Sequence, residues 1–186
     1  MKTDRTNLDE ILLLLRTKHF SNLLVPGYFM KADPARIEAD PVRRFNLLPD
    51  EVYLEAGAGG PYLRLTAVNQ GDQLAMRVVG KITHDPGLPD DEEAEAGVAS
   101  LSEIYFGEAD DLPCLSLRCL LDDGSSLESG IVKFAEFTFA GDQHVSFDPL
   151  WTFGIRIGQP NTEPRFRANH PGVFGFKEEY FWSADD

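Results

Sequence analysis

The segment Leu112–Ile157, LPCLSLRCLLDDGSSLESGIVKFAEFTFAGDQHVSFDPLWTFGIRI, decides the fold that the sequence predicts. Its first part alternates, with apolar residues at positions 115, 117, 119 and 121 and polar residues at 116 and 118. Turn-forming residues separate it from two further apolar runs, Ile131–Phe139 and His144–Ile157, and Pro149 interrupts the second run. Period-two alternation between turns is typical of an antiparallel meander with one buried face.

The N-terminal residues predict an amphipathic helix. Asn7 is a suitable N-terminal cap, and Glu10 follows three residues later as a capping box requires. Leucine or isoleucine at positions 8, 11, 12 and 15 share one helical face, so we expect a core-packing helix that ends near Lys18 or Phe20. Four prolines between Pro26 and Pro49 argue against long regular elements there.

Further strands are predicted at 52–55, 62–68, 74–83 and 101–106, with the glycine-rich residues 56–61 as a hairpin loop. Residues 91–99 are expected to form one or two helical turns at most, because Gly97 weakens a helix. Together these elements predict an α+β fold, in which the N-terminal helix packs on a mostly antiparallel, strongly bent β-sheet, a meander or half-barrel. The length of 186 residues fits a single domain, 1–186, with an acidic loop insertion at about 84–100.

The composition is that of a globular protein. Apolar residues make up 42% of the chain and aromatic residues 11%, which suffices for a sizeable core. The sequence has no run of 18 apolar residues and no recognisable signal peptide, so we expect a cytoplasmic protein without a transmembrane helix. Cys114 and Cys119 are an odd number of residues apart, which predicts opposite faces of one strand and reduced core thiols rather than a disulfide.

The charge is strongly acidic and unevenly distributed. The formal net charge is −14, and no Lys or Arg occurs from Ile82 to Leu117. Such a field repels nucleic acid and anionic membranes and attracts a basic protein, although a purely solubilising role explains it equally well. Phe106 and Tyr105 are the expected anchors, and the turn Asp122-Asp123 is a second candidate contact. The expected partner-binding residues are Asp85, Asp90, Asp91, Glu92, Glu93, Glu95, Tyr105, Asp110 and Asp111.

Catalytic motifs are weak throughout the chain. None of the four histidines has metal-binding spacing, and Asp142, His144 and Asp148 are the nearest approach to an acid–base or metal site. The sequence contains no G-x-S-x-G, and neither cysteine lies in a known nucleophile signature. These features favour a non-enzymatic protein that uses no cofactor or metal.

Two functions remain open. The first is a non-catalytic acidic inhibitor that neutralises a basic partner protein, a toxin or a nuclease, in the manner of an immunity protein, an antitoxin or a nucleic-acid mimic. Its partners would include neither nucleic acid nor membrane. The alternative is a small-molecule-binding or catalytic β-domain with His144 as the polar contact of an aromatic-lined cleft. The cleft residues would be Phe134, Trp151, Phe153 and Trp182.

Overall fold

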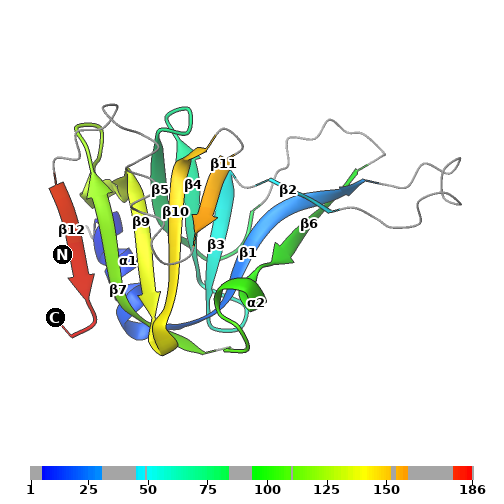
Figure 1. Cartoon of the computed structure of the whole chain (residues 1–186), viewed down its shortest axis with the longest axis horizontal. Coiled ribbons are helices and arrows are strands. Elements are labelled where there is room, and N and C mark those ends of the chain that lie inside the picture. The colour runs from blue at the N-terminus through cyan, green and yellow to red at the C-terminus, as the bar shows by residue number, and fades with distance from the viewer. Residues whose placement is uncertain are drawn as a thin grey trace, which may run out of the picture.

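The computed structural model describes residues 6–30, 45–48, 50–83, 94–109, 111–151, 154–158 and 178–185. These residues form a twelve-stranded antiparallel sheet, which is not a closed barrel, and two α-helices (Figure 1). No helix in this part of the chain is long and apolar enough to cross a membrane. The elements are α1 (Asn7–Thr17), β1 (His19–Met30), β2 (Phe45–Leu47), β3 (Glu51–Ala56), β4 (Tyr62–Val68), β5 (Gln73–Val79), β6 (Ala94–Ser100), α2 (Ser102–Tyr105), β7 (Leu112–Leu121), η1 (Leu127–Ser129), β8 (Ile131–Val132), β9 (Phe134–Phe139), η2 (Ala140–Asp142), β10 (Gln143–Trp151), β11 (Gly154–Gly158) and β12 (Glu178–Ser183).

The sheet is built from two meanders joined by one long strand. Neighbouring strands follow the order β11-β10-β9-β7-β1-β3-β4-β5-β8, and β12, β2 and β6 pair at the sides of this path. The run from β7 to β11 confirms the predicted antiparallel meander. The hairpins of β3, β4 and β5 form the second meander. Strand β1 connects the two because its first residues pair with both β7 and β3.

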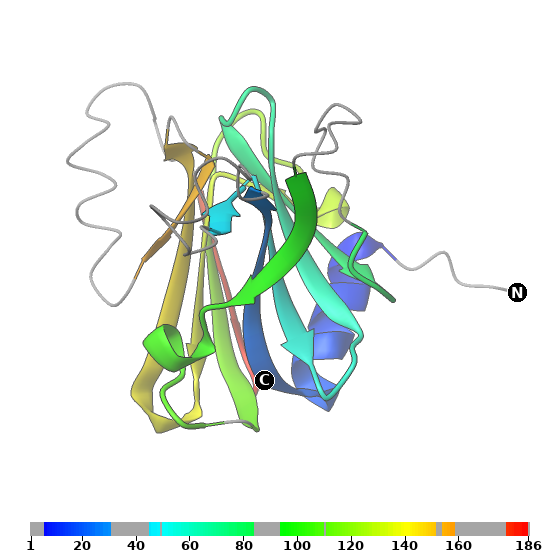
Figure 2. The ribbon, with the colours of Figure 1, turned by 90° about the vertical axis from the view of Figure 1, so that its right-hand side faces the viewer.

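The core lies between the two meanders. Strands β9, β10 and β11 approach β3, β4 and β5 across it, and Figure 2 shows the two groups as opposite sides of the molecule. The rings of Phe137 and Phe147 meet edge-to-face with centroids 5.8 Å apart, a geometry that stabilises by about 0.5–1.5 kcal/mol beyond simple burial. Helix α1 closes the core on the β5 side with Ile11 and Leu15, both at most 2% exposed.

The predicted N-terminal helix is confirmed, but its cap lies one residue earlier than expected. Thr6 is the N-cap, and a capping box joins its side chain and backbone to Asp9. The amide of Asn7 instead donates to the carbonyl oxygens of Met76 (2.6 Å) and Ser129 (2.8 Å), which fastens the helix to β5 and η1. The helix ends at Thr17, before Phe20.

The expectation that Pro26 ends regular structure is wrong, because β1 runs through it to Met30. The carbonyl of Pro26 accepts a hydrogen bond from the N–H of Leu48 on the β2 side. Its missing N–H therefore points to that side as well, and the ladder on the other side loses nothing. Gly27 allows β2 to approach, since a side chain there would collide with the carbonyl of Asn46.

Strand β7 departs from strict alternation at its start. Its register against β9 shifts between Cys114 and Ser116. A bulge of this kind adds one residue and changes the face of those that precede it. Cys114 and Cys119 are consequently both buried in one core, and the prediction of opposite faces is wrong, whereas the prediction of free core thiols is confirmed. Leu115, expected to face the core, is 43% exposed.

The expected acidic loop insertion is partly strand. Residues 94–100 form β6, and the predicted strand 101–106 is instead the short helix α2. Residues 84–93, the rest of the predicted insertion, lie outside the described residues. Strand β6 pairs with the outer half of β1, and together with β2 it extends away from the end of the molecule that holds α1 (Figure 1).

Candidate functional site

The best candidate site is an acidic surface built from β6, α2 and the turn after them. We define the acidic surface as residues 94–109 and Asp111, which contain no Lys or Arg. Glu95, Glu103, Glu108 and Asp111 are all exposed on it. Within the described residues, Glu103 and Glu108 have no ion-pair partner, so neutralising them breaks no salt bridge of the fold.

Only three of the nine predicted partner-binding residues fall in the described part of the chain. Glu95 lies on β6, Tyr105 ends α2, and Asp111 precedes β7. The others, Asp85, Asp90, Asp91, Glu92, Glu93 and Asp110, lie outside the described residues. The second candidate contact, Asp122-Asp123, follows β7 and belongs to a different cluster, described below.

Asp111 contacts the side chain of His19 at the start of β1. Its Oδ1 lies 3.0 Å from Nδ1 of His19, and the two side chains are 75% and 52% exposed. A polar contact this exposed contributes at most about 1 kcal/mol. It joins the start of β1 to the start of β7, and Asp111 remains accessible to a partner.

The two predicted anchors are not the exposed apolar residues of the acidic surface. Phe106 is 1% exposed, and its ring packs edge-to-face against Phe139 in the core. Tyr105 is half-buried, and its hydroxyl donates to the carbonyl of Ile157 at 3.0 Å. The exposed apolar side chains are Ile104 at 62% and Val98 at 44%. A strand over 101–106 would put Ile104 on the same face as Phe106, whereas the helical turn α2 leaves Phe106 buried and Ile104 exposed.

A polar network holds α2 and β6 against the body of the protein. The Ser102 hydroxyl donates to the Asn22 side-chain oxygen and accepts from the N–H of Leu23, both at 3.0 Å. The Asn22 amide in turn donates to Glu55, which is 8% exposed and also accepts from the N–H of Gly59 at 2.9 Å. The acidic surface is therefore held on a fixed support.

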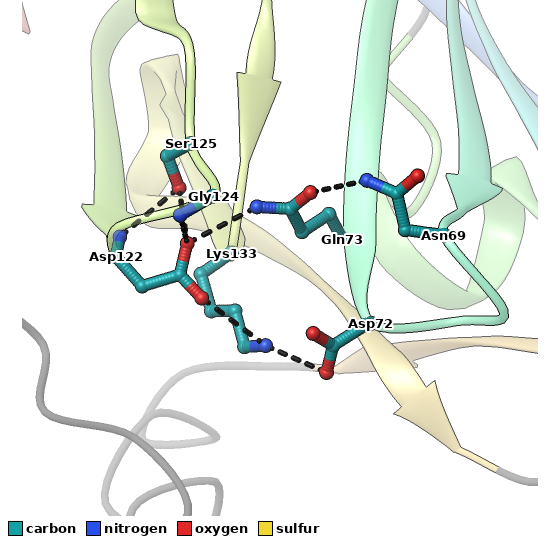
Figure 3. Close-up of polar contacts among 7 residues, drawn as sticks. All are labelled: Asn69, Asp72, Gln73, Asp122, Gly124, Ser125 and Lys133. Carbon is teal, nitrogen blue, oxygen red and sulfur yellow. Dashed lines mark hydrogen bonds and ion pairs between the residues drawn. The ribbon is translucent and has the colours of Figure 1, made fainter.

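A second polar cluster surrounds the fully buried Lys133, between β8 and β9. Its ammonium lies 2.8 Å from Asp72 Oδ1 and 3.3 Å from Asp122 Oδ2, so two carboxylates balance the charge (Figure 3). The side-chain amide of Gln73 donates to Asp122 at 3.1 Å and accepts from Asn69. A buried charge without such partners costs several kcal/mol, which explains the density of this cluster.

The contacts of the Lys133 cluster indicate that it stabilises the fold. Burial by itself raises the pKa of the Asp122 carboxyl, but the hydrogen bond from Ser125 and the charge of Lys133 outweigh it and hold the pKa below its usual value. Nucleophilic lysines lie in apolar pockets or beside another cation, whereas Lys133 lies between carboxylates. The cluster ties the β4–β5 turn to the turn after β7. The sequence signal for it is a lysine within an apolar run, at 131–139.

The predicted acid–base group is not assembled. His144 Nε2 lies 3.6 Å from Asp142 Oδ1, and Nδ1 lies 3.2 Å from the Thr138 hydroxyl. Asp148 is buried four residues further along β10, roughly 13 Å away at 3.3 Å per residue. Over the described ranges, no group of three or more His, Cys, Asp or Glu side chains is arranged to hold a metal ion.

The cysteines are poor nucleophiles in this environment. Burial raises the pKa of the Cys114 thiol to about 12, and it raises that of Cys119 further still. Because the thiolate is the reactive form, neither side chain suits nucleophilic catalysis at neutral pH.

Two members of the predicted aromatic cleft are buried. Phe134 is 0% and Trp182 is 3% exposed, and Trp182 belongs to the main core. The Trp151 side chain and Phe153 lie outside the described residues. A largely polar hollow of ≈ 470 Å³ lies at the start of α1, and neither Phe134 nor Trp182 lines it. It is lined by Asn7, Glu10, Arg77, Val78, Glu128 and Ser129.

Comparisons with protein-family models, with curated proteins and with solved structures find no match to this chain. Its function is therefore inferred from its own charge and geometry.

Proposed function

We propose that this protein is a non-catalytic acidic inhibitor that binds and neutralises a basic partner protein, as immunity proteins, antitoxins and nucleic-acid mimics do. The observation that supports the proposal is the acidic surface, which carries four exposed carboxylates and the exposed side chains of Val98 and Ile104 but no Lys or Arg. Carboxylates at the rim of an interface speed the encounter with a cationic protein, and apolar anchors at its centre slow dissociation.

The distribution of charge favours binding over solubility alone. Solubility is served by interspersed charges of both signs and by few exposed apolar side chains. The chain has 31 acidic and 17 basic residues, yet none of the basic residues lies between Ile82 and Leu117. A single-sign field of this extent is what long-range steering of a cationic partner requires.

Affinity capture from the native host tests this proposal. The tagged protein is incubated with lysate at ~0.05 M and ~0.15 M salt, which changes the screening length appreciably. We compare wild type with Glu103→Gln/Glu108→Gln, which neutralises the acidic surface. The control, Glu10→Gln/Glu128→Gln, removes the same charge from exposed positions at α1 and η1.

The expected result is a basic protein that wild type and the control retain, that the acidic-surface variant retains less, and that salt weakens. If that protein is a nuclease or a toxin, adding the wild-type chain should abolish its activity at stoichiometric amounts. Recovery of no basic protein at either salt concentration, or equal loss in both double variants, would overturn the proposal.

A further inference from the structure

Among the described residues, strand β6 is paired along one edge and unpaired along the other, which we call its open edge. It pairs with β1 over an unbroken antiparallel register from Leu24–Ser100 to Met30–Ala94. No described strand pairs with its other edge. Proteins commonly protect such an edge with Lys, Pro or a bulge, and β6 has no Lys, no Pro and no break in its register.

Two hydrogen bonds fix the direction of the backbone groups on this ribbon. The N–H of Leu101 donates to the carbonyl of Leu23 at 2.8 Å, so these residues form a bonded pair. Leu48 donates to the carbonyl of Pro26 at 2.9 Å, so the backbone of Pro26 faces β2 and not β6. Bonded and non-bonded pairs alternate along an antiparallel ladder, so the direction of every other residue follows.

The backbone N–H and C=O groups of successive β6 residues point alternately to its two edges. Gly97 and Ala99 direct their N–H and C=O groups to β1. Ala96 and Val98 direct theirs outward, and both residues are exposed. Neither forms a side-chain or turn hydrogen bond within the described residues. The open edge thus presents two consecutive sets of backbone donors and acceptors, the template for one more strand.

We propose that the open edge of β6 accepts an extended segment of the basic partner as an additional strand; this inference rests on the proposed function. Direct neighbours in a strand point to opposite faces. Val98 lies on one face, and Glu95 lies on the other. A segment that alternates apolar and basic residues would match both faces, with its apolar residues on the face of Val98 and its cations on the face of Glu95.

A second copy of this chain is a poorer occupant than a basic partner. Each copy carries a net charge of −14, and pairing two β6 edges would bring two acidic surfaces together. Like charges opposite one another destabilise strand pairing. The charge therefore selects a partner of opposite sign.

A defined peptide tests the inference without knowledge of the natural partner. The probe is an end-capped peptide of about nine residues that alternates Lys and Val, long enough to form one strand. The control, called the Lys-Pro peptide, alternates Pro with Lys that is methylated at its backbone nitrogen, which keeps the charge and removes all backbone donors. The readout is amide hydrogen exchange by NMR, which reports each N–H separately. In the free protein, Gly97 and Ala99 should exchange slowly, and Ala96 and Val98 fast.

The Lys-Val peptide should slow exchange at Ala96 and Val98 by about tenfold or more, and the Lys-Pro peptide should not. The variant Val98→Pro removes an outward N–H without removing a bond to β1, so it should weaken Lys-Val binding by about tenfold. Val98→Thr retains the N–H and a similar shape, and it should bind as wild type does. Slow exchange at Gly97 and Ala99 in both variants shows that β6 is still paired.

The outcomes separate this inference from the proposed function. If both peptides bind equally, and Glu103→Gln/Glu108→Gln weakens both, electrostatic capture stands and strand addition is wrong. If the Lys-Val peptide leaves the exchange of Ala96 and Val98 unchanged at low salt, strand addition is also wrong. Protection of both amides in a free protein that sediments as a dimer would assign the edge to a second copy instead. Failure of the host capture would overturn the proposed function even if the peptide binds.

Discussion

At the residue scale, the most informative side chain is Lys133. A lysine is seldom fully buried, and here two carboxylates from separate turns compensate its charge. The contacts account for its burial without a catalytic role. Because of these contacts, we expect the replacement of Lys133 to lower the free energy of unfolding strongly.

Replacing Lys133 with Met keeps most of its volume and leaves the Asp122 carboxylate without its counter-charge. We expect a loss of about 3 kcal/mol in the free energy of unfolding, the cost typical of breaking a buried pair from one side. The matched variant Asp72→Asn should cost no more than about 1 kcal/mol, because Asp72 is 53% exposed. Urea unfolding measures both free energies. A Lys133→Met protein as stable as Asp72→Asn would refute the stabilising role of the Lys133 cluster.

The lowered pKa of Asp122 predicts a pH dependence of stability. A carboxyl with a folded-state pKa below its unfolded value of 3.8 stabilises the fold above pH 3.8. This stabilisation is lost as pH falls from 3.8 through the folded pKa. Asp122→Asn should therefore be less stable than wild type at pH 6, and the difference should shrink below pH 3.8. The exposed control Glu128→Gln should track wild type, and a constant difference for Asp122→Asn would contradict the ionic interpretation.

The buried thiols predict slow chemical modification. With the pKa of Cys114 raised to about 12, the thiolate is scarce at pH 8 in the folded protein. A thiol-reactive dye should label neither cysteine within the time that labels both in guanidinium. Rapid labelling of the native protein by one equivalent of dye would show that one of the two thiols is accessible.

At the scale of elements, the predictable parts are those whose own sequence alternates or repeats at helical spacing. The meander of β7 to β11, the hairpins of β3 to β5, and α1 follow from patterns within each segment. Strand β1 was missed because Pro26 and Gly27 signal a break locally, and only the position of β2 makes them acceptable. Strand β6 was missed because its small residues carry little strand propensity and its order comes from pairing with β1.

The same reasoning applies to the candidate site. The acidic surface was predictable because charge is visible in composition, but its anchors were not. A strand over 101–106 puts Ile104 and Phe106 on the same inward face, whereas only Phe106 is buried. The Lys133 cluster brings Lys133 into contact with Asp72 and Asp122, which lie 61 and 11 positions away in the sequence. No local sequence pattern predicts contacts between residues so far apart.

The close approach of β2 to β1 gives a prediction for this ribbon. A methyl group at Gly27 would collide with the carbonyl of Asn46 and the ring of Phe45. We expect Gly27→Ala to destabilise by about 1–3 kcal/mol, as overpacking does. Gly80→Ala adds the same methyl group where nothing lies within 4 Å, and it should stay within about 0.5 kcal/mol of wild type. Equal thermal stability of the two variants would refute close packing at Gly27.

At the scale of the whole molecule, β6 of the acidic surface and α1 lie at different ends (Figure 1). The body between them is fastened by the Lys133 cluster on one side and by the Glu55–Asn22–Ser102 network on the other. The acidic surface is thus presented by a rigid scaffold. Binding through it should require little reordering of the described residues, so its charge should act mainly on the rate of association.

The most direct test is the association rate constant with the captured basic partner, measured by stopped flow across a series of salt concentrations. Wild type should associate fast at low salt and lose rate steeply as salt rises. Glu103→Gln/Glu108→Gln should associate about threefold more slowly at low salt with a shallower salt dependence, and Glu10→Gln/Glu128→Gln should stay close to wild type. Identical rates for all three proteins across the series would mean that the acidic surface does not guide binding, and the central claim would be wrong.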